Sequence, residues 1–138
     1  MPFFRLDQSR APLYVVTFEG TATDAEFDKY LATMTLVVER QRKYGMIMDA
    51  MRSERPTSRQ RKLQSEWLKD QDANLRAYSA GTAFVIGSAL VRGGLTAIFW
   101  LQPPSVPTTV VSTLAEAESW VTQRMLERDI EPGRPRGA

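Results

Sequence analysis

Apolar and polar positions along the chain follow two different periods, and their alternation predicts the order of the secondary-structure elements. Short apolar runs typical of strands lie at residues 3–7, 13–19, 44–50, 82–87 and 108–112, and the run at 13–19 is rich in β-branched and aromatic residues. Apolar residues at helical spacing occupy residues 23–43, 57–78, 88–101 and 113–128. The predicted order is therefore β-β-α-β-α-β-α-β-α, with an N-terminal hairpin.

Residues with strong local preferences predict where the helices begin. Thr23 and Glu26 have the spacing of a capping box, as do Thr113 and Glu116. Thr57 or Ser58 is expected to cap the second helix.

The helix ends are predicted in the same way. Three cations, Arg40, Arg42 and Lys43, are expected in the last turn of the first helix, where they suit the helix dipole. We expect Gly45 to help the chain leave that helix and Gly81 to stop the second one. The pair Gly93-Gly94 predicts a weak point or bend in the third helix.

Strands that alternate with helices after the first hairpin predict an α/β fold. The expected architecture is a mostly parallel mixed sheet of about five strands, with right-handed crossovers and helices packed on it. A chain of 138 residues fits one domain. We place that domain at residues 1–130 and expect the remaining segment, 131–138 (EPGRPRGA), to be a disordered basic tail.

The apolar segment 82–101 is long enough to span a bilayer. Arg92 lies at its middle, which costs about 2.5–3.5 kcal/mol on the insertion scale. The segment is therefore predicted to be a buried strand followed by a helix, and no transmembrane segment is expected.

The amino-acid composition excludes several kinds of catalytic and metal-binding site. The chain has no cysteine and no histidine, so it lacks thiolate nucleophiles, the commonest general base and the commonest metal ligand. No metal and no cofactor are expected, and the protein is interpreted as a non-enzyme. A net charge of +2, with no aromatic residues interleaved among the cations, argues against nucleic-acid binding. A cytoplasmic, reduced setting is the expectation.

Several segments resemble the STAS fold, best known from anti-sigma factor antagonists. They include VVTFEGTATDAEFDKYL at residues 15–31, MIMDA at 46–50, AIFWLQPP at 97–104 and EAESWV at 116–121, together with the single Arg92. The resemblance covers nearly the whole chain, up to about Arg128. More closely, these segments look like STAS/SEC14-type, sporulation-antagonist-like bacterial domains of unknown role. The resemblance implies a STAS-like fold and a regulatory, protein-binding role.

One part of the chain departs from this pattern. In the sigma-pathway antagonists, the strand that carries the aspartate leads to an Asp-Ser-(Ser/Gly) turn whose serine is phosphorylated at a helix start. Here Asp49 is present, but the next helix begins with Pro56, Thr57 and Ser58. Whether Thr57 or Ser58 is phosphorylated stays open.

The densest group of cations surrounds this helix start. A helix N-terminus already favours anions, and arginine adds bidentate recognition of carboxylate or phosphate. We therefore predict a site for an anion or an acidic partner, and its residues are Arg52, Arg55, Ser58, Arg59, Arg61 and Lys62. The alternative is a solvated loop whose cations balance nearby acidic residues.

A second candidate site lies at the expected C-terminal edge of the sheet. Asp49 and Arg92 could pair there, and Phe99 and Trp100 could line a ligand groove. The alternative for the aromatic residues is packing of the third helix on the sheet. Asp49 is interpreted as a residue that orders the following loop, and catalysis by Asp49 is the weakest hypothesis.

The leading functional hypothesis is a regulatory module that docks a partner protein through the loop and helix start after the strand at 44–50. The alternative is a carrier or sensor of a small apolar or anionic lipid-like ligand, with the third helix as a movable wall. Homodimerisation is left open by the sequence.

Overall fold

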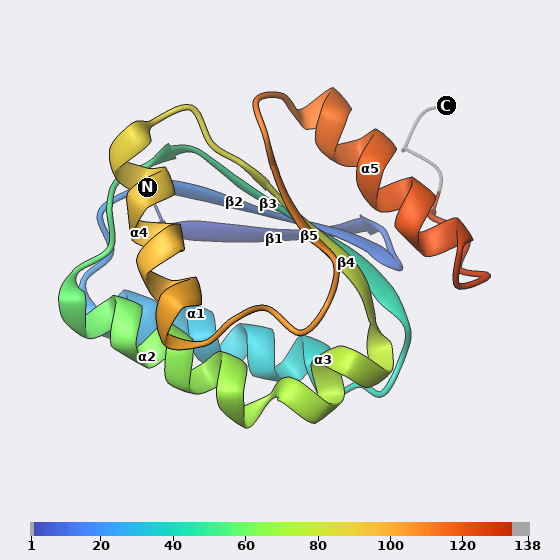
Figure 1. Ribbon diagram of the computed structural model, residues 1–138, viewed down its shortest axis with the longest axis horizontal. Coiled ribbons are helices and arrows are strands. Elements are labelled where there is room, and N and C mark those ends of the chain that lie inside the picture. Colours follow the sequence, from blue (N-terminus) through green and yellow to red (C-terminus); the bar gives the residue numbers. More distant parts are fainter. Residues whose placement is uncertain (1, 134–138) are drawn as a thin grey trace.

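A five-stranded mixed sheet forms the centre of the structure, a computed structural model that describes residues 2–133 (Figure 1). The elements follow one another along the chain as β1 Phe4–Arg10, β2 Leu13–Gly20, α1 Asp24–Val38, β3 Tyr44–Ser53, α2 Ser58–Asp70, α3 Asp72–Tyr78, β4 Ser79–Val85, α4 Ala89–Leu101, β5 Thr108–Val111 and α5 Leu114–Leu126.

The strands lie in the sheet in the same order as in the chain, β1-β2-β3-β4-β5. Strand β1 pairs antiparallel with β2, whereas β2-β3, β3-β4 and β4-β5 pair in parallel. The predicted α/β fold with a hairpin and a mostly parallel five-stranded sheet is confirmed.

This strand order decides which face each helix covers. Three successive crossovers of the same hand place their helices on one face of the sheet. Figure 1 shows α1, α2, α3 and α4 on that face and α5 on the other. The first face therefore receives four helices, whereas the second receives only the helix that follows the last strand.

The face under α5 is a close-packed aliphatic layer. Ile47 and Ala83 of the sheet and Ala117, Val121 and Met125 of α5 have no exposed surface. Gly45 lies in β3 under this helix, and a Cβ there would stand 2.6 Å from Met125 Sδ. Gly45 therefore permits α5 to approach the sheet, which corrects its predicted role at a helix end.

The face under the crossover helices has an aromatic core. Phe3, Phe18, Phe27 and Tyr30 are buried together, and the Phe18 and Tyr30 ring centroids lie 5.2 Å apart. This cluster packs α1 against β1 and β2. It leaves the part of the sheet formed by β3 and β4 to be covered by α2, α3 and α4.

Several predicted boundaries were wrong. Helix α1 ends at Val38, so Arg40, Arg42 and Lys43 lie beyond its last turn, and Gln41 has a φ of 57°. Strand β3 continues to Ser53 through residues that were predicted as loop.

The second predicted helix and the strand after it also differ from expectation. The helix is divided at Gln71 into α2 and α3. Strand β4 begins at Ser79 and includes Gly81, where a Cβ would lie 3.1 Å from the Trp120 ring. Gly81 therefore serves packing under α5 and does not stop a helix.

The predicted helix starts are confirmed. Thr23 and Glu26 form a complete capping box, as do Thr57 and Gln60. Thr113 caps α5 by accepting a hydrogen bond from the Glu116 backbone N–H. Helix α4 runs through Gly93 and Gly94 as one continuous element.

The predicted tail begins with residues that pack on the domain. The backbone N–H of Gly133 donates to the Arg10 carbonyl at 3.1 Å, and Ile130, the last residue of the predicted domain, is buried. Residues 134–138 of that predicted tail lie outside the described residues. Within residues 2–133, no helix has the length and apolar character needed to cross a membrane.

Candidate functional site: a cavity beneath helix α4

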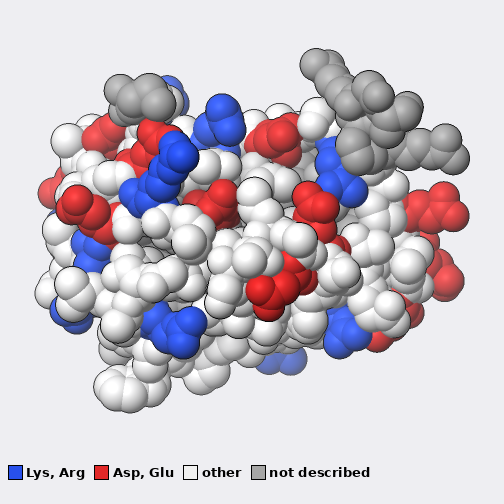
Figure 2. All heavy atoms as spheres, turned by 90° about the horizontal axis from the view of Figure 1, so that it is seen from above, with Lys and Arg blue, Asp and Glu red and all other residues white. Residues whose placement is uncertain are grey.

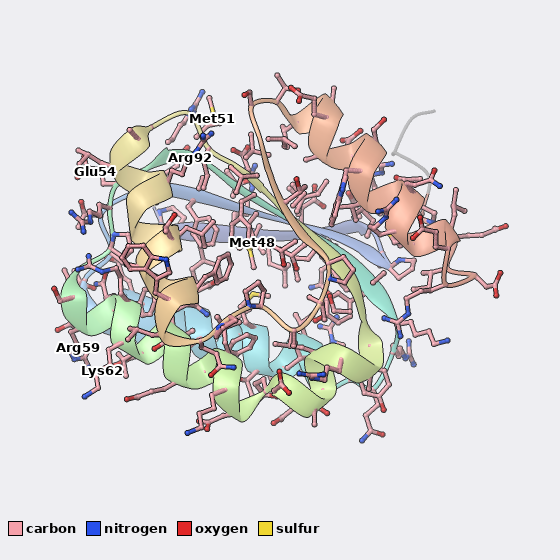
Figure 3. The ribbon with its side chains drawn as sticks, in the orientation of Figure 1. Met48, Met51, Glu54, Arg59, Lys62 and Arg92 are labelled. Carbon is pink, nitrogen blue, oxygen red and sulfur yellow. The ribbon has the colours of Figure 1, made fainter. Side chains whose placement is uncertain are left out.

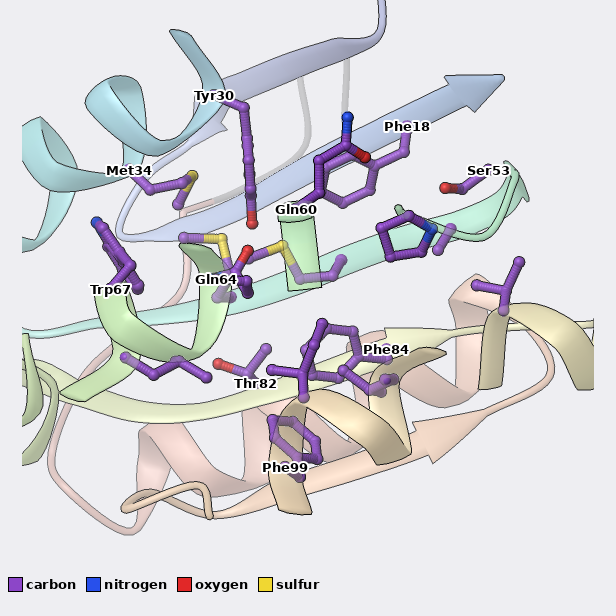
Figure 4. A pocket seen from close by; sticks show the side chains of 18 of the residues that line it. Phe18, Tyr30, Met34, Ser53, Gln60, Gln64, Trp67, Thr82, Phe84 and Phe99 are labelled. Atoms are coloured by element: carbon purple, nitrogen blue, oxygen red, sulfur yellow. The ribbon is translucent and has the colours of Figure 1, made fainter. Parts of the chain in front are cut away.

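A cavity of about 170 Å³ lies between the sheet and the crossover helices (Figure 4). Its floor is the inner face of β3 and β4, and its walls come from α1, α2, α3 and α4. The side chains that define it are mostly apolar, and among them are Met46, Met48, Phe84, Tyr30, Met34, Trp67, Leu68, Leu75, Val91, Leu95, Ile98 and Phe99.

The position of α4 explains why the cavity exists. Helix α4 packs against α2 and the loop before it, where Gly94 lies so close to Pro56 that a Cβ would stand 3.2 Å from the proline Cδ. Its contact with the sheet includes the ring of Phe99, whose centroid is 6.0 Å from that of Phe84. Helix α4 thus rests on a neighbouring helix and spans the space over the sheet.

The connector after α4 closes a further side of the cavity. Pro104, Ser105 and Val106 line it there. The Ser105 hydroxyl hydrogen-bonds the Asp72 carboxylate, which lowers the pKa of Asp72, with Arg76 contributing further. This contact fixes the connector to the start of α3.

The deep wall of the cavity carries polar atoms but, among the described residues, no charge. Trp67 Nε1 donates to Thr35 Oγ1 at 2.9 Å, and buried Gln60 donates from Nε2 to the Ala22 carbonyl at 2.9 Å. Burial raises the pKa of Tyr30, and it raises the pKa of Tyr44 to about 12. Both tyrosines are therefore neutral at physiological pH, and the interior is suited to uncharged, apolar groups.

The rim of the cavity is formed by the loop between β3 and α2. Ser53, Glu54, Arg55 and Pro56 all line the cavity, and Glu54 and Arg55 are also exposed to solvent. Residues that contact both a cavity and solvent mark places where it reaches the surface, and Thr21 and Pro104 share this property. Glu54 and Arg55 are the charged residues among the described ones that line it.

The predicted basic site lies in and after this loop, but several of its cations are engaged. Arg52 pairs with Glu19 at 3.5 Å and Arg59 with Asp24 at 3.1 Å. Arg61 donates to the Pro56 carbonyl at 2.7 Å and to Ser58 Oγ at 3.0 Å.

Lys62 is the member of the predicted basic site that lies furthest along α2. It is exposed, and Figure 3 shows it beside Arg59 at the start of that helix. The cations therefore follow the loop and first turns of α2 individually and do not converge on one pocket.

The residues of the predicted groove are separated in the structure. Phe99 lines the cavity, whereas Asp49, Arg92 and Trp100 are not among the described residues that line it. Trp100 is 83% exposed on the outer side of α4. Arg92 is also exposed, and no ion pair between it and Asp49 is present among residues 2–133.

Asp49 has a local structural contact. Its Oδ1 accepts a hydrogen bond from the Met51 backbone N–H at 3.2 Å, a contact within β3, and ordering of the following loop by Asp49 stays a prediction.

Sequence reasoning missed most of the cavity. Met48 and Thr82 face it from the floor and Trp67 from the wall (Figures 3 and 4). The signal in the sequence is weak: three consecutive apolar residues, Met46-Ile47-Met48, are typical of a strand covered on both faces, but they do not indicate a space on one of them.

Charges elsewhere do not suggest another kind of site. Within residues 2–133, no group of three or more acidic residues lies together in a way that could hold a metal ion. Figure 2 shows cations and anions interspersed on the face seen from above, with a largely uncharged area at its lower left.

Comparisons with known proteins give matches in structure only. No family model matches the chain, and no curated protein matches its sequence. Among solved structures, the anti-sigma factor antagonist SpoIIAA in its unphosphorylated form is similar, with a TM-score of 0.60, 16% identity, and coverage of 87% of this chain and 96% of that one. The fold is STAS-like.

Two further structures share this STAS-like fold. An anti-sigma factor antagonist from Mycobacterium paratuberculosis has a TM-score of 0.56 and 17% identity over 86% of this chain and 92% of that one. A DUF3478-family protein with a SpoIIAA-like fold from Shewanella loihica has a TM-score of 0.57 and 8% identity over 86% of this chain and 91% of that one. Such identities establish a likeness of fold.

Proposed function

We propose that this STAS-like domain is a non-enzymatic binding module that takes a small apolar ligand into the cavity beneath α4. The observation that carries the proposal is the cavity itself, about 170 Å³ in volume with mostly apolar walls. A well-formed apolar pocket with a few polar groups is the usual form of a small-molecule site. The size suits a ligand, because an engineered cavity of about 150 Å³ in another protein holds benzene.

The first experiment asks whether the purified protein takes up an apolar molecule. Native mass spectrometry would detect a ligand that copurifies, and thermal unfolding would be followed with added 1-octanol. A ligand at 100 times its Kd raises the free energy of unfolding by about 2.7 kcal/mol, so a concentration-dependent increase in Tm is expected.

A cavity-blocking variant makes this experiment specific. Thr82→Phe places a ring in the floor of the cavity and should abolish the octanol-dependent increase in Tm, with Thr82→Leu as the substitute if it does not fold. Thr96→Phe is the matched control, because Thr96 is exposed on α4. No Tm increase in the wild-type protein, or an equal increase in Thr82→Phe, would contradict the proposal.

A second candidate function is docking of a partner protein on the loop between β3 and α2. It is favoured by the exposed cations of this loop and by the two structural neighbours named as anti-sigma factor antagonists. Arg55 and Lys62 are the best positions to test, since Arg59 and Arg61 have contacts within the domain.

Charge reversal tests the docking candidate. The protein would be used as bait in a lysate of the source cells. The double variant Arg55→Glu, Lys62→Glu should no longer capture a specific partner that the wild-type protein captures. Lys69→Glu, on the same helix as Lys62, should still capture it. Equal recovery by wild-type protein and the double variant would count against this surface.

A further inference from the structure

The charged groups of the cavity are confined to its rim. Of the described residues that line it, Glu54 and Arg55 alone carry charge, and both belong to the loop between β3 and α2. The interior opposite them is formed by apolar side chains and by neutral groups such as Thr82 and Gln64. A ligand that fills the cavity would therefore have an apolar body and would meet charge only where it emerges.

The two rim charges differ in how far they are already engaged. Glu54 Oε2 accepts a hydrogen bond from Thr21 Oγ1 at 2.7 Å, and the Glu54 backbone N–H donates to the Gly20 carbonyl at 3.0 Å. Glu54 thus ties the loop to the end of β2, and its carboxylate is partly occupied by that contact.

Arg55 has no such contact. Among residues 2–133 it forms no ion pair and its guanidinium forms no hydrogen bond, whereas its neighbours Arg52 and Arg59 each pair with a carboxylate. Its stem lies against α4, where a Cβ on Gly94 would stand 3.4 Å from Arg55 Cγ. Packing therefore holds the stem of Arg55 at the rim, and its five N–H donors remain available.

We propose that the ligand is a single-chain carboxylic acid whose carboxylate binds Arg55 while its alkyl chain fills the cavity. This inference rests on the proposed function, because it names the ligand class of the same site. Arginine recognises carboxylate by two parallel hydrogen bonds, which suits a head group at the rim. A volume close to that of the benzene-binding cavity limits the acid to about six to eight carbons.

Three probes of equal chain length separate the contributions of head group and chain. Octanoate, 1-octanol and octylamine would be titrated into ¹⁵N-labelled protein, with Kd taken from backbone amide shifts. Octanoate should bind about tenfold more tightly than 1-octanol, the lower end of what a charge-assisted hydrogen bond gives, because the rim is exposed. Octylamine should bind no better than 1-octanol.

Arg55→Gln tests the assignment of the head-group site. It should weaken octanoate binding by about tenfold and so reduce the preference for octanoate over 1-octanol to about onefold, and Arg55→Lys should restore part of that preference. Arg59→Gln is the matched control, since Arg59 is exposed close by but is paired with Asp24 and is not a lining residue. A preference that persists in Arg55→Gln would overturn the role of Arg55.

The probes also distinguish failure of this inference from failure of the proposed function. If 1-octanol binds as tightly as octanoate, or octylamine binds more tightly, the carboxylic acid is refuted while the apolar site stands. If none of the three probes binds, the cavity is not a ligand site and both proposals fall.

Discussion

The two faces of the sheet are covered in opposite ways. Under α5, five side chains from the sheet and the helix are wholly buried, and Gly45 lets the helix approach closely. Under the crossover helices, the same sheet borders a cavity of about 170 Å³. One helix packs more tightly on its face than four helices do on theirs.

Chain connectivity accounts for this difference. Helix α5 follows the last strand and is free to settle where its apolar stripe fits the sheet. Helix α4 is fixed at both ends by β4 and β5, and it contacts α2 through Gly94 and Pro56. A helix held in this way bridges space over the sheet, so the cavity lies on the crossover face.

The largest expected effect compares two adjacent residues of β3 that point to opposite faces. Ile47 is fully buried under α5, whereas Met48 is partly buried and lines the cavity. Truncation of a fully packed side chain to alanine costs about 2–5 kcal/mol. Ile47→Ala should fall in that range, and Met48→Ala should cost about half as much, because the contacts around it are already incomplete.

Urea unfolding at neutral pH would measure both free energies. The proposed contrast between the faces would be refuted if Met48→Ala destabilised the protein as much as Ile47→Ala.

The sequence carried the element order well, because periodicity is a local property. The run LYVVTFE at residues 13–19 and the capping residues Thr23 and Thr57 identify their elements without reference to the rest of the chain. The roles of Gly45 and Gly81 were misassigned. Both positions require glycine because a Cβ there would meet side chains of α5, which lies about 40 or more positions away in the sequence.

The candidate site was harder to predict from the sequence than the element order, because it depends on contacts between residues that lie far apart in the chain. Phe99 was identified as a possible groove residue, but the cavity depends on where α4 lies relative to α2, which no period in the sequence encodes. Arg52 and Arg59 likewise pair with Glu19 and Asp24, which lie far from them in the sequence, whereas Arg55 has no ion pair among residues 2–133. Composition showed the basic cluster but not which of its members form ion pairs within the domain.

High pH should lower the free energy of unfolding through a tyrosine on the cavity face of the sheet. Burial raises the pKa of Tyr44 to about 12, against about 10 in an unfolded chain. The folded state therefore holds this proton more tightly, so its contribution is complete below pH 10 and is lost as the pH rises toward 12. The free energy of unfolding lost in this way is about 3 kcal/mol in all, at 1.36 kcal/mol per pKa unit.

Urea unfolding between pH 8 and pH 11.5 tests this dependence. Tyr44→Phe should flatten the decrease in stability above pH 10, and adding Tyr30→Phe should flatten it further, because burial raises the pKa of Tyr30 as well. An unchanged slope in the double variant would contradict the assignment of alkaline sensitivity to the cavity face.

A larger side chain should have opposite effects on the stability of the protein on the two faces of the sheet. Gly45→Ala places a methyl group 2.6 Å from Val121 Cγ1 and should cost about 1–3 kcal/mol through overpacking. Ala50→Val adds two methyl groups at a cavity-lining position of β3, where valine also suits a strand, and should leave the stability unchanged or raise it slightly.

Thermal unfolding of the two variants provides the measurement. Ala50→Val should also weaken 1-octanol binding, which a simple gain in strand propensity would not do. A destabilised Ala50→Val protein would show that the cavity face is as tightly packed as the α5 face.

The smallest expected effect concerns the adjacent glycines of α4. A Cβ added at Gly93 would meet nothing within 4 Å, whereas a Cβ on Gly94 would lie 3.2 Å from Pro56 Cδ. Alanine is favoured over glycine in a helix by about 0.5–1 kcal/mol. Gly93→Ala should therefore stabilise the protein by that amount, while at Gly94 the contact with Pro56 should cancel the gain or reverse it.

Because this contact holds α4 over the cavity, Gly94→Ala should in addition change 1-octanol affinity, and Gly93→Ala should not. Equal stabilisation by both substitutions, with unchanged affinity, would mean that α4 is not held in place through Gly94 and Pro56.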